Sequence, residues 1–208
     1  MIAHKTAERE ELMTTIGYRS LVAFGMALAA AVSLQGCMQW SEIVRDKNAG
    51  MNGGFEVAAS GLPVNWSVYS PKTVPDADFD IVMDTTDPKE GKQCLKFVVR
   101  KCESTGGRLS PGIHNEFHDT KPGETYRISF WAKNSGSAFA FTAKGVKAMG
   151  GESGNVIQSS ETFDSWRRFE CTNTIPPKMW LRLELNVTRP GTLWIDDIQI
   201  VKVSDKSE

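Results

Sequence analysis

Residues 180–187 read W-L-R-L-E-L-N-V. Apolar residues occupy every second position, so that one face would carry Leu181, Leu183, Leu185 and Val187, and the other Trp180, Arg182, Glu184 and Asn186. Successive side chains of a β-strand point to opposite faces of its sheet. The alternation therefore predicts a strand with one face in a hydrophobic core and the other face polar.

The same alternation recurs through residues 95–100, 126–131 and 193–203, with Pro-Gly, Asn-Ser-Gly and Pro-Pro pairs between the runs. In the last run Asp196-Asp197 interrupts the period, which predicts a β-bulge there. No helical period of useful length appears after residue 50. Many short alternating strands separated by turn residues predict an all-β fold, a two-sheet antiparallel β-sandwich or jelly roll.

The beginning of the chain has a different character. Residues 21–34 form an uncharged apolar run, LVAFGMALAAAVSL, which follows Arg19 and leads into Leu34-Gln35-Gly36-Cys37. The run is too short to span a bilayer comfortably. A basic flank, a short apolar segment and small residues before a cut predict a secretory signal peptide over residues 1–36. The alternative is a buried helix, but this run is apolar on all sides instead of striped.

The L-Q-G-C ending resembles the lipobox of bacterial lipoproteins. The resemblance implies that Cys37 is acylated, becomes the first residue of the mature chain and holds it on a membrane of the bacterial cell envelope, at the outer membrane or the cell surface. Residues 37–50 are polar and mixed, so we expect them to form a tether. The folded domain is predicted to span residues 51–203, followed by a short tail at 204–208.

Charge and cysteine content exclude some functions. The formal net charge is −1, and acidic and basic residues are interspersed, so no basic stripe predicts nucleic-acid binding. Three cysteines follow Cys37, and in an exported protein two of them are expected to pair. Cys94 and Cys102 lie near the two ends of one predicted strand, too far apart to bond. The favoured pair is therefore Cys171 with one of these two.

Six segments point to a family. They are N-G-G-F-E at 52–56, L-P-V-N-W at 62–66, G-K-Q-C-L-K-F at 91–97, K-P-G-E-T-Y-R-I-S-F-W-A-K at 121–133, F-D-S-W-R-R-F at 163–169 and L-W-I-D-D-I at 193–198. In this order the segments resemble carbohydrate-binding modules of the cellulose- and xylan-binding kind, with the galactose-binding-like jelly roll. The resemblance covers nearly all of residues 51–203. It implies two facing antiparallel sheets, with sugar bound on a concave sheet face or in loops at one edge.

The resemblance also implies a structural calcium ion near the ends of the domain. Carried over to matching positions, Glu56 and Asp196 would be its side-chain ligands, and Asp197 could replace Asp196. Calcium takes oxygen ligands, which backbone carbonyl groups would complete. The alternative is that the acids only cap turns. Trp66 and Trp166 match positions that are structural in the family, which implies that both belong to the core.

A neutral sugar needs a flat apolar surface for its C–H faces and polar side chains for its hydroxyl groups. On the strand from Tyr126, Trp131 lies on the face opposite the core. If this strand and the strand from Trp180 share the concave sheet, Trp131 and Trp180 become stacking platforms beside the polar side chains Arg182, Glu184 and Asn186. The alternative is that a loop covers one or both tryptophans. If sugar binds in the loops at one edge and not on the sheet face, Tyr69 could line that edge site.

Two other kinds of chemistry, metal binding and glycoside hydrolysis, have candidate residues in the sequence. His114, Glu116 and His118 alternate along a strand and could present three ligands to a metal ion, but a polar strand face is the favoured interpretation. Glycosidases need two carboxylates flanking a cleft. Glu161, Asp164 and Glu170 instead surround the core-like Phe163 and Trp166, and the sequence contains no G-x-S-x-G, P-loop or H-E-x-x-H motif.

The sequence therefore predicts a cell-envelope lipoprotein whose single domain binds a polysaccharide or oligosaccharide without acting as an enzyme. Two alternatives remain open. One is a structural or protein-interaction β-sandwich, because one fold serves many partners. The other is a small jelly-roll glycoside hydrolase or polysaccharide lyase.

Overall fold

The computed structural model describes residues 41–203 except 149, 152 and 153. The predicted signal peptide, Cys37 and the tail at 204–208 lie outside these residues. Within the described part of the chain, no helix is both long enough and apolar enough to cross a membrane.

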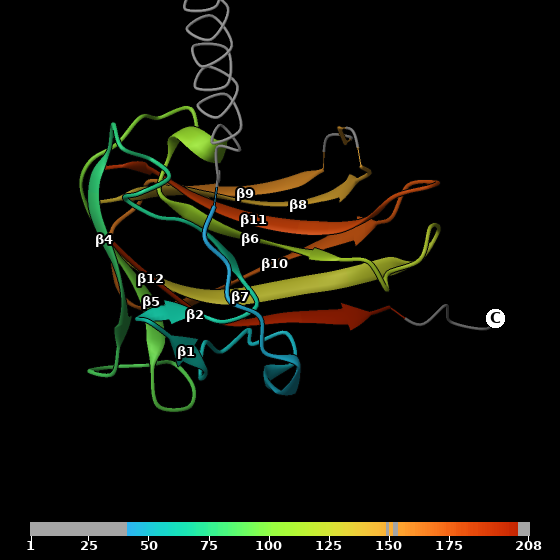
Figure 1. The fold of residues 1–208 in the computed structure, drawn as a ribbon, viewed down its shortest axis with the longest axis horizontal. Coiled ribbons are helices and arrows are strands. Elements are labelled where there is room, and N and C mark those ends of the chain that lie inside the picture. Colours follow the sequence, from blue (N-terminus) through green and yellow to red (C-terminus); the bar gives the residue numbers. More distant parts are fainter. Residues whose placement is uncertain (1–40, 149, 152–153, 204–208) are drawn as a thin grey trace, which may run out of the picture. The chain divides into compact units, whose positions relative to one another are not determined.

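Two five-stranded antiparallel sheets dominate the domain and lie over one another as two layers (Figure 1). The first, here the β11 sheet, has the order β3-β6-β11-β8-β9, and the second, the β7 sheet, has the order β10-β7-β12-β5-β4. A two-stranded sheet, β1-β2, lies beside them. The predicted all-β sandwich is thereby confirmed. The elements are η1 Lys47–Ala49, β1 Ala58–Ala59, β2 Leu62–Pro63, β3 Ser67–Tyr69, β4 Asp78–Asp84, β5 Cys94–Lys101, η2 Gly107–Leu109, β6 Gly112–Phe117, β7 Thr125–Ser135, β8 Ala138–Val146, β9 Asn155–Ser159, β10 Phe163–Thr174, β11 Trp180–Arg189 and β12 Gly191–Lys202.

The core lies between the two layers, where alternate residues of each strand meet. On β11 the buried apolar positions are those that the sequence predicted, Leu181, Leu183, Leu185 and Val187. Across the core, Phe130 of β7 stacks on Phe141 of β8 with 4.2 Å between ring centres. Such packed aromatic pairs add to the free energy gained by burying their surface. The outward positions of β11 are consequently held on the other side of its sheet.

The predicted bulge in β12 is present. The register with β7 shifts between Asp196 and Gln199, and Asp197 has a φ of 48°. Directly after the bulge, the N–H of Ile198 donates to the carbonyl of Gly53 at 2.9 Å. A Cβ at position 53 would lie 2.0 Å from the carbonyl oxygen of Ile198, so the close approach requires glycine. The first and last segments of the domain therefore lie side by side.

The cysteine pairing expected from the sequence is wrong. Cys94, Cys102 and Cys171 are all unpaired thiols. Cys94 begins β5 and Cys171 lies on β10, and in the β7 sheet these strands are separated by β12 and β7. Three strand spacings of about 4.8 Å each exceed the reach of a disulfide bond.

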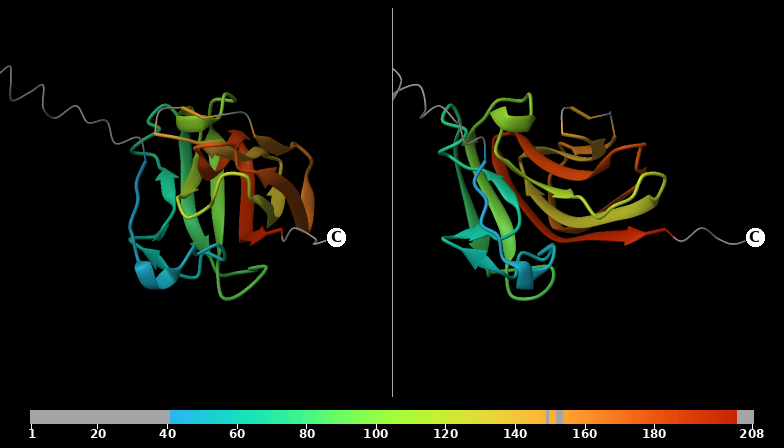
Figure 2. Two further views of the ribbon diagram at one scale, coloured as in Figure 1. Left: turned by 90° about the vertical axis from the view of Figure 1, so that its right-hand side faces the viewer. Right: turned by 45° about the vertical axis from the view of Figure 1, so that its right-hand side comes forward.

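The predicted boundary at residue 51 is too late. Glu42 and Val68 exchange backbone hydrogen bonds of 2.8 and 2.6 Å. Figure 1 and Figure 2 show the segment 41–50 running along the sandwich. The side chain of Asn65 donates to the carbonyls of Asp46 and Gly50 at 2.6 and 2.8 Å and accepts from the N–H of Asp46 at 2.8 Å. Residues 42–50, predicted as part of a tether, are therefore part of the folded domain.

Replacing Asn65 by glycine tests this attachment. Asn65 has a φ of 67°, which glycine also adopts without strain, so Asn65→Gly removes only the side chain and its three hydrogen bonds. We expect the free energy of unfolding to fall by about 1–3 kcal/mol and the amides of residues 42–50 to exchange faster with solvent. Denaturant unfolding and hydrogen exchange measure both effects. Asn48→Ala, at an exposed position of the same segment, is the control, and equal protection in both variants would contradict the attachment.

Candidate functional site

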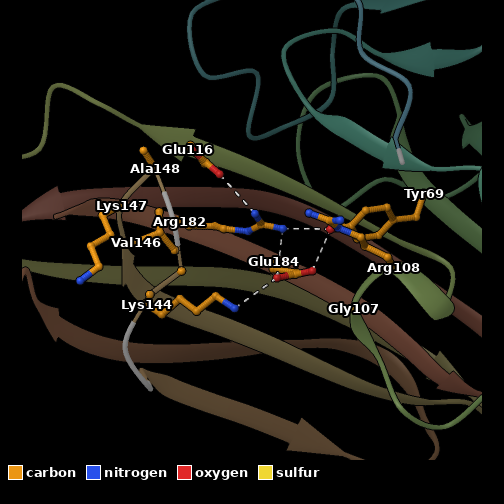
Figure 3. A pocket seen from close by; sticks show the side chains of 12 residues that line it. Tyr69, Gly107, Arg108, Glu116, Lys144, Val146, Lys147, Ala148, Arg182 and Glu184 are labelled. Atoms are coloured by element: carbon orange, nitrogen blue, oxygen red, sulfur yellow. Dashed lines mark hydrogen bonds and ion pairs between the residues drawn. The ribbon is translucent and has the colours of Figure 1, made fainter. Parts of the chain in front are cut away.

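The outer face of the β11 sheet contains a groove of about 470 Å³. Strands β3, β6, β8 and β11 contribute to it, and the loops after β5 and β8 form parts of its rim (Figure 3). Its described lining residues are Tyr69, Gly107, Arg108, Glu116, Lys144, Val146, Lys147, Ala148, Gly150, Gly151, Arg182 and Glu184. We refer to this depression as the groove.

Cross-strand register brings the charged side chains of the groove together. Arg182 on β11 lies opposite Glu116 on β6 and opposite Lys144 on β8. Its guanidinium donates from Nη1 to Glu116 Oε1 at 3.2 Å and lies 3.3 Å from Glu184 Oε2. Lys144 Nζ lies 3.6 Å from the same Glu184 oxygen. Directly opposed side chains of neighbouring strands interact in this way because they project from the same face.

Tyr69 closes the network from the edge strand β3. Its hydroxyl group donates to Glu184 Oε1 at 3.0 Å and accepts from Arg182 Nη2 at 2.9 Å. The ring is buried and packs on His114, with 5.1 Å between ring centres. Tyr69 thus supplies a fixed hydroxyl group to the groove floor, but it offers no exposed ring face.

The pKa values fix the protonation states of this network. Burial raises the pKa of Glu184, but the charges of Arg182 and Lys144 and the bond from Tyr69 together hold it below its usual value. Burial, with the charge of Glu184, raises the pKa of Tyr69. Burial, with the nearby Arg182, lowers the pKa of His114 to about 4. At neutral pH the network therefore contains an ionised Glu184 and an uncharged Tyr69, and the His114 ring packed on Tyr69 is also uncharged.

Three predicted ligand residues lie in or beside the groove. Arg182 and Glu184 line it. Trp180 is half-buried on the same face of β11, and its Nε1 donates to Glu116 Oε2 at 2.9 Å. The ring of His118 packs against the indole of Trp180, with 4.6 Å between centres. Trp180 is therefore an aromatic surface next to the charged network.

Asn186, predicted as a ligand residue, is enclosed by a loop. Its side chain accepts from the N–H of Gly107 at 2.9 Å and donates to the carbonyl of the same residue at 3.0 Å. The side chain of Ser110 ties this loop together by donating to the carbonyl of Glu103 at 2.7 Å. The role of Asn186 in the structure is thus to hold the loop that carries Arg108 at the rim of the groove.

The expectation that Trp131 and Trp180 share a sheet is wrong. Trp131 is on β7, and its indole lies on the outer face of the other sheet, under Lys89 Nζ at 4.1 Å from the ring centre. Trp166, expected in the core, is half-buried on β10 of that sheet and donates to the carbonyl of Asp87 at 3.1 Å. Trp66 is buried as expected. Alternation assigns a face within one strand, but it does not say which strands become neighbours.

Sequence reasoning missed part of the groove. The sequence pattern does not identify Lys144, Lys147 and Arg108 as site residues, and it places Tyr69 at an edge site. The available signal was the alternation of His114, Glu116 and His118, which was weighed as a metal site. In the structure Glu116 instead binds Arg182 and Trp180, and the described residues contain no group of three or more His, Cys, Asp or Glu placed to hold a metal ion.

Residues 47–192 match the family model described as a carbohydrate binding domain. The chain belongs to this family. A search of curated proteins finds no match.

Solved structures share the fold of this carbohydrate binding domain. The xylan-binding domain of Xyn10C from Paenibacillus barcinonensis aligns with a TM-score of 0.52 at 18% identity, covering 74% of this chain and 93% of that one. The C-terminal family 22 module of Xyn10B from Clostridium thermocellum gives 0.53 at 15%, covering 78% and 100%. The enzymatically active domain of tailspike protein 4 from bacteriophage CBA120 gives 0.54 at 16%, covering 73% of this chain, but this chain spans only 21% of that one. At these identities the likeness is one of fold.

Glu56 and Asp196, the predicted calcium ligands, bind the loop between β4 and β5 of the carbohydrate binding domain. Asp196 is fully buried and accepts from the N–H groups of Lys89 and Glu90 at 2.9 and 3.0 Å, while Glu56 accepts from Lys92 at 3.0 Å. These contacts agree with the alternative that the acids cap turns. Burial raises the pKa of Asp196 to about 6, and a hydrogen bond with Asp197 raises the pKa of Glu90. Calcium binding among these carboxyl groups stays a prediction.

We expect calcium to stabilise the folded carbohydrate binding domain, because a cation would relieve repulsion between these carboxyl groups. Binding to the folded state alone contributes about 2.7 kcal/mol at a hundredfold excess over the dissociation constant. The melting temperature should therefore rise with calcium and fall when a chelator is added. Glu56→Gln should abolish the rise, whereas Glu161→Gln, at an exposed site outside this loop, should retain it. A melting temperature that does not change with calcium would contradict the calcium site, and Glu56 and Asp196 would then only cap the loop.

Proposed function

We propose that the groove binds a polysaccharide without cleaving it. The observation that carries this proposal is the groove itself, an open depression on a sheet face of a chain that belongs to a carbohydrate binding domain family. The side chains that line it are hydrogen-bond donors and acceptors, and hydrogen bonds and ion pairs among them fix their positions. Such pre-positioned polar groups fix the orientation of a hydroxyl-rich ligand and reduce the ordering cost of binding.

The carboxylates of the groove support a binding role over a hydrolytic one. A glycosidase needs a carboxylic acid whose pKa is raised, so that it can protonate the leaving group. Here Arg182 contacts both Glu116 and Glu184, and the pKa of Glu184 is lowered. Two of the three candidate acids for hydrolysis are also ion-paired, Glu161 with Arg167 and Glu170 with Arg168, both at 2.8 Å. These carboxylates therefore act as ion-pair partners of arginine, and Glu184 does not have the raised pKa that a general acid needs.

Trp180 provides the apolar surface that a pyranose ring requires. It projects from the same face of β11 as Arg182, and through Glu116 its indole is connected to the charged network. A sugar resting on this ring would place its hydroxyl groups towards Arg182 and Glu116. Aromatic rings bind such C–H faces while the surrounding polar groups set the orientation.

The two tryptophans that were predicted together make a matched test. We expect Trp180→Ala to weaken polysaccharide binding about tenfold, or ~1.4 kcal/mol, because the stacking surface is lost. Trp131→Ala, on the opposite outer face, should bind as the unchanged protein does. Affinity electrophoresis against a panel of soluble polysaccharides measures both, with melting temperatures as a check of folding. Loss of binding in Trp131→Ala alone would place the site on the β7 sheet instead.

We further propose that a lipid at Cys37 holds the domain in the bacterial cell envelope. Support comes from the L-Q-G-C sequence at 34–37, which lies outside the described residues. Attachment to a surface raises the effective concentration of binding modules where a polymer arrives, so that several weak contacts act together. Residues 38–41 would remain as the short connection to the first backbone pairing, at Glu42.

Substituting Cys37 tests the anchor. In a bacterial expression host, we expect the unchanged chain to incorporate labelled fatty acid and to sediment with membranes. Cys37→Ser should lose both properties, because the serine hydroxyl group cannot receive the thioether-linked lipid that the resemblance implies. Cys102→Ser is the control, since this thiol belongs to the folded domain. Membrane association that survives Cys37→Ser would contradict a lipid at this residue.

A further inference from the structure

The groove carries a surplus of positive charge. Its described lining contains four basic side chains, Arg108, Lys144, Lys147 and Arg182, and two acidic ones, Glu116 and Glu184. The chain as a whole has a formal net charge of −1. The described lining therefore carries a formal excess of two positive charges in a chain that is nearly neutral, and such an excess in a depression attracts anions.

The arrangement of these charges in depth increases the effect. Glu184 forms the floor, with 8% of its side chain exposed, whereas Lys144 above it has 30% exposed. Lys147 and Arg108 are exposed at the rim. In Figure 3 the ammonium group of Lys147 points away from the ion-pair network. An entering ligand therefore meets Lys147 and Arg108 at the rim before it reaches Glu184, while Glu116, with 30% of its side chain exposed, is already ion-paired with Arg182.

Hydrogen-bonding capacity remains inside the network. Arg182 Nε and His114 Nδ1 are two of the described side-chain atoms that are buried without a hydrogen-bond partner. Arg182 uses only its Nη atoms on Glu116 and Tyr69. A buried donor without a hydrogen-bond partner lowers the stability of the folded state. A water molecule or a polar group of a ligand that accepts from this donor after a small side-chain movement would remove that cost.

The lining of the groove, taken without Trp180 beside it, is poorly suited to a neutral sugar chain. The only aromatic residue in its described lining is Tyr69, whose ring is buried, and Trp180 lies beside the groove. Neutral sugars rely on exposed ring faces for much of their binding energy. The floor and rim of the groove instead contain charged side chains.

We propose that the ligand of the groove is an anionic polysaccharide, whose carboxylate or sulfate groups are bound by Lys144, Lys147 and Arg108. This inference rests on the proposed function and specifies its substrate class. A negative group at the rim would form charge-assisted hydrogen bonds with the ammonium groups, while the uncharged parts of the sugar contact Arg182 and Trp180. The recognised feature is a repeated negative charge on a sugar chain.

Polygalacturonate and its fully methyl-esterified form make a matched pair of probes, because esterification removes the charge and keeps the sugar chain. We expect the protein to bind polygalacturonate more tightly than the ester and to lose affinity as salt increases. Lys144→Gln/Lys147→Gln should weaken binding about tenfold, as expected when two accessible ion pairs are lost. Lys101→Gln/Lys121→Gln, which changes the net charge equally at exposed positions outside the groove lining, should leave the affinity unchanged. Lys147→Arg should also retain it, because the charge remains.

A sulfated galactan and a neutral xylan complete the panel. Tighter binding of the galactan, weakened by the same lysine variant, supports the proposal and identifies sulfate as the bound group. Equal binding of xylan, ester and polygalacturonate, with no effect of the lysine variant, overturns the anionic ligand and leaves the proposed function intact. Binding to none of the polysaccharides overturns both. Equal binding of DNA and polygalacturonate, unaffected by the variant, overturns the proposal because it shows unspecific attraction of polyanions.

Discussion

The structure depends on the burial of one face of β11. Its leucines and Val187 fill the core beneath the central strand of the sheet, so the alternating positions must project outward on the other side. A shift of register by one residue would place Arg182 and Glu184 in the core, at a large cost in desolvation. The same constraint that closes the sandwich therefore displays a charged row across β6, β11 and β8.

That row is stable because its charges are mutually satisfied. A buried carboxylate is costly unless it is paired and hydrogen-bonded. Glu184 has two cations and the hydroxyl group of Tyr69 around it, and Arg182 is shared between two carboxylates. Because the side chains hold one another, a ligand meets charges that are already in place and loses less free energy in ordering them. The contacts that make the network rigid are therefore also those on which the proposed recognition of a ligand depends.

Much of the fold follows from local patterns in the sequence. The alternation in 180–187 predicts which side of β11 is buried, and Asp196-Asp197 predicts the bulge in β12, since both depend only on neighbouring residues. The site required pairing information. Lys144 lies beside Arg182 because β8 pairs with β11. Trp131 lies outside the predicted site because β7 belongs to the other sheet. Strand order arises from long-range packing, which a period of two residues does not encode. The segment 42–50 likewise joins the domain through Asn65, a contact across the chain.

The two outer faces contain similar residue types in opposite arrangements. On the β7 sheet, lysines cover the tryptophans: Lys133 Nζ lies 4.7 Å from the ring centre of Trp194 and also pairs with Asp87 at 2.7 Å. The cation–π contacts there place an ammonium group over a ring face, so that a ligand stacking on that face would have to displace the lysine. On the β11 sheet, Lys147 points away from the network, and Trp180 packs against the ring of His118 and donates a hydrogen bond to Glu116. This difference between the two outer faces supports the proposal that the groove, and not the outer face of the β7 sheet, binds the ligand.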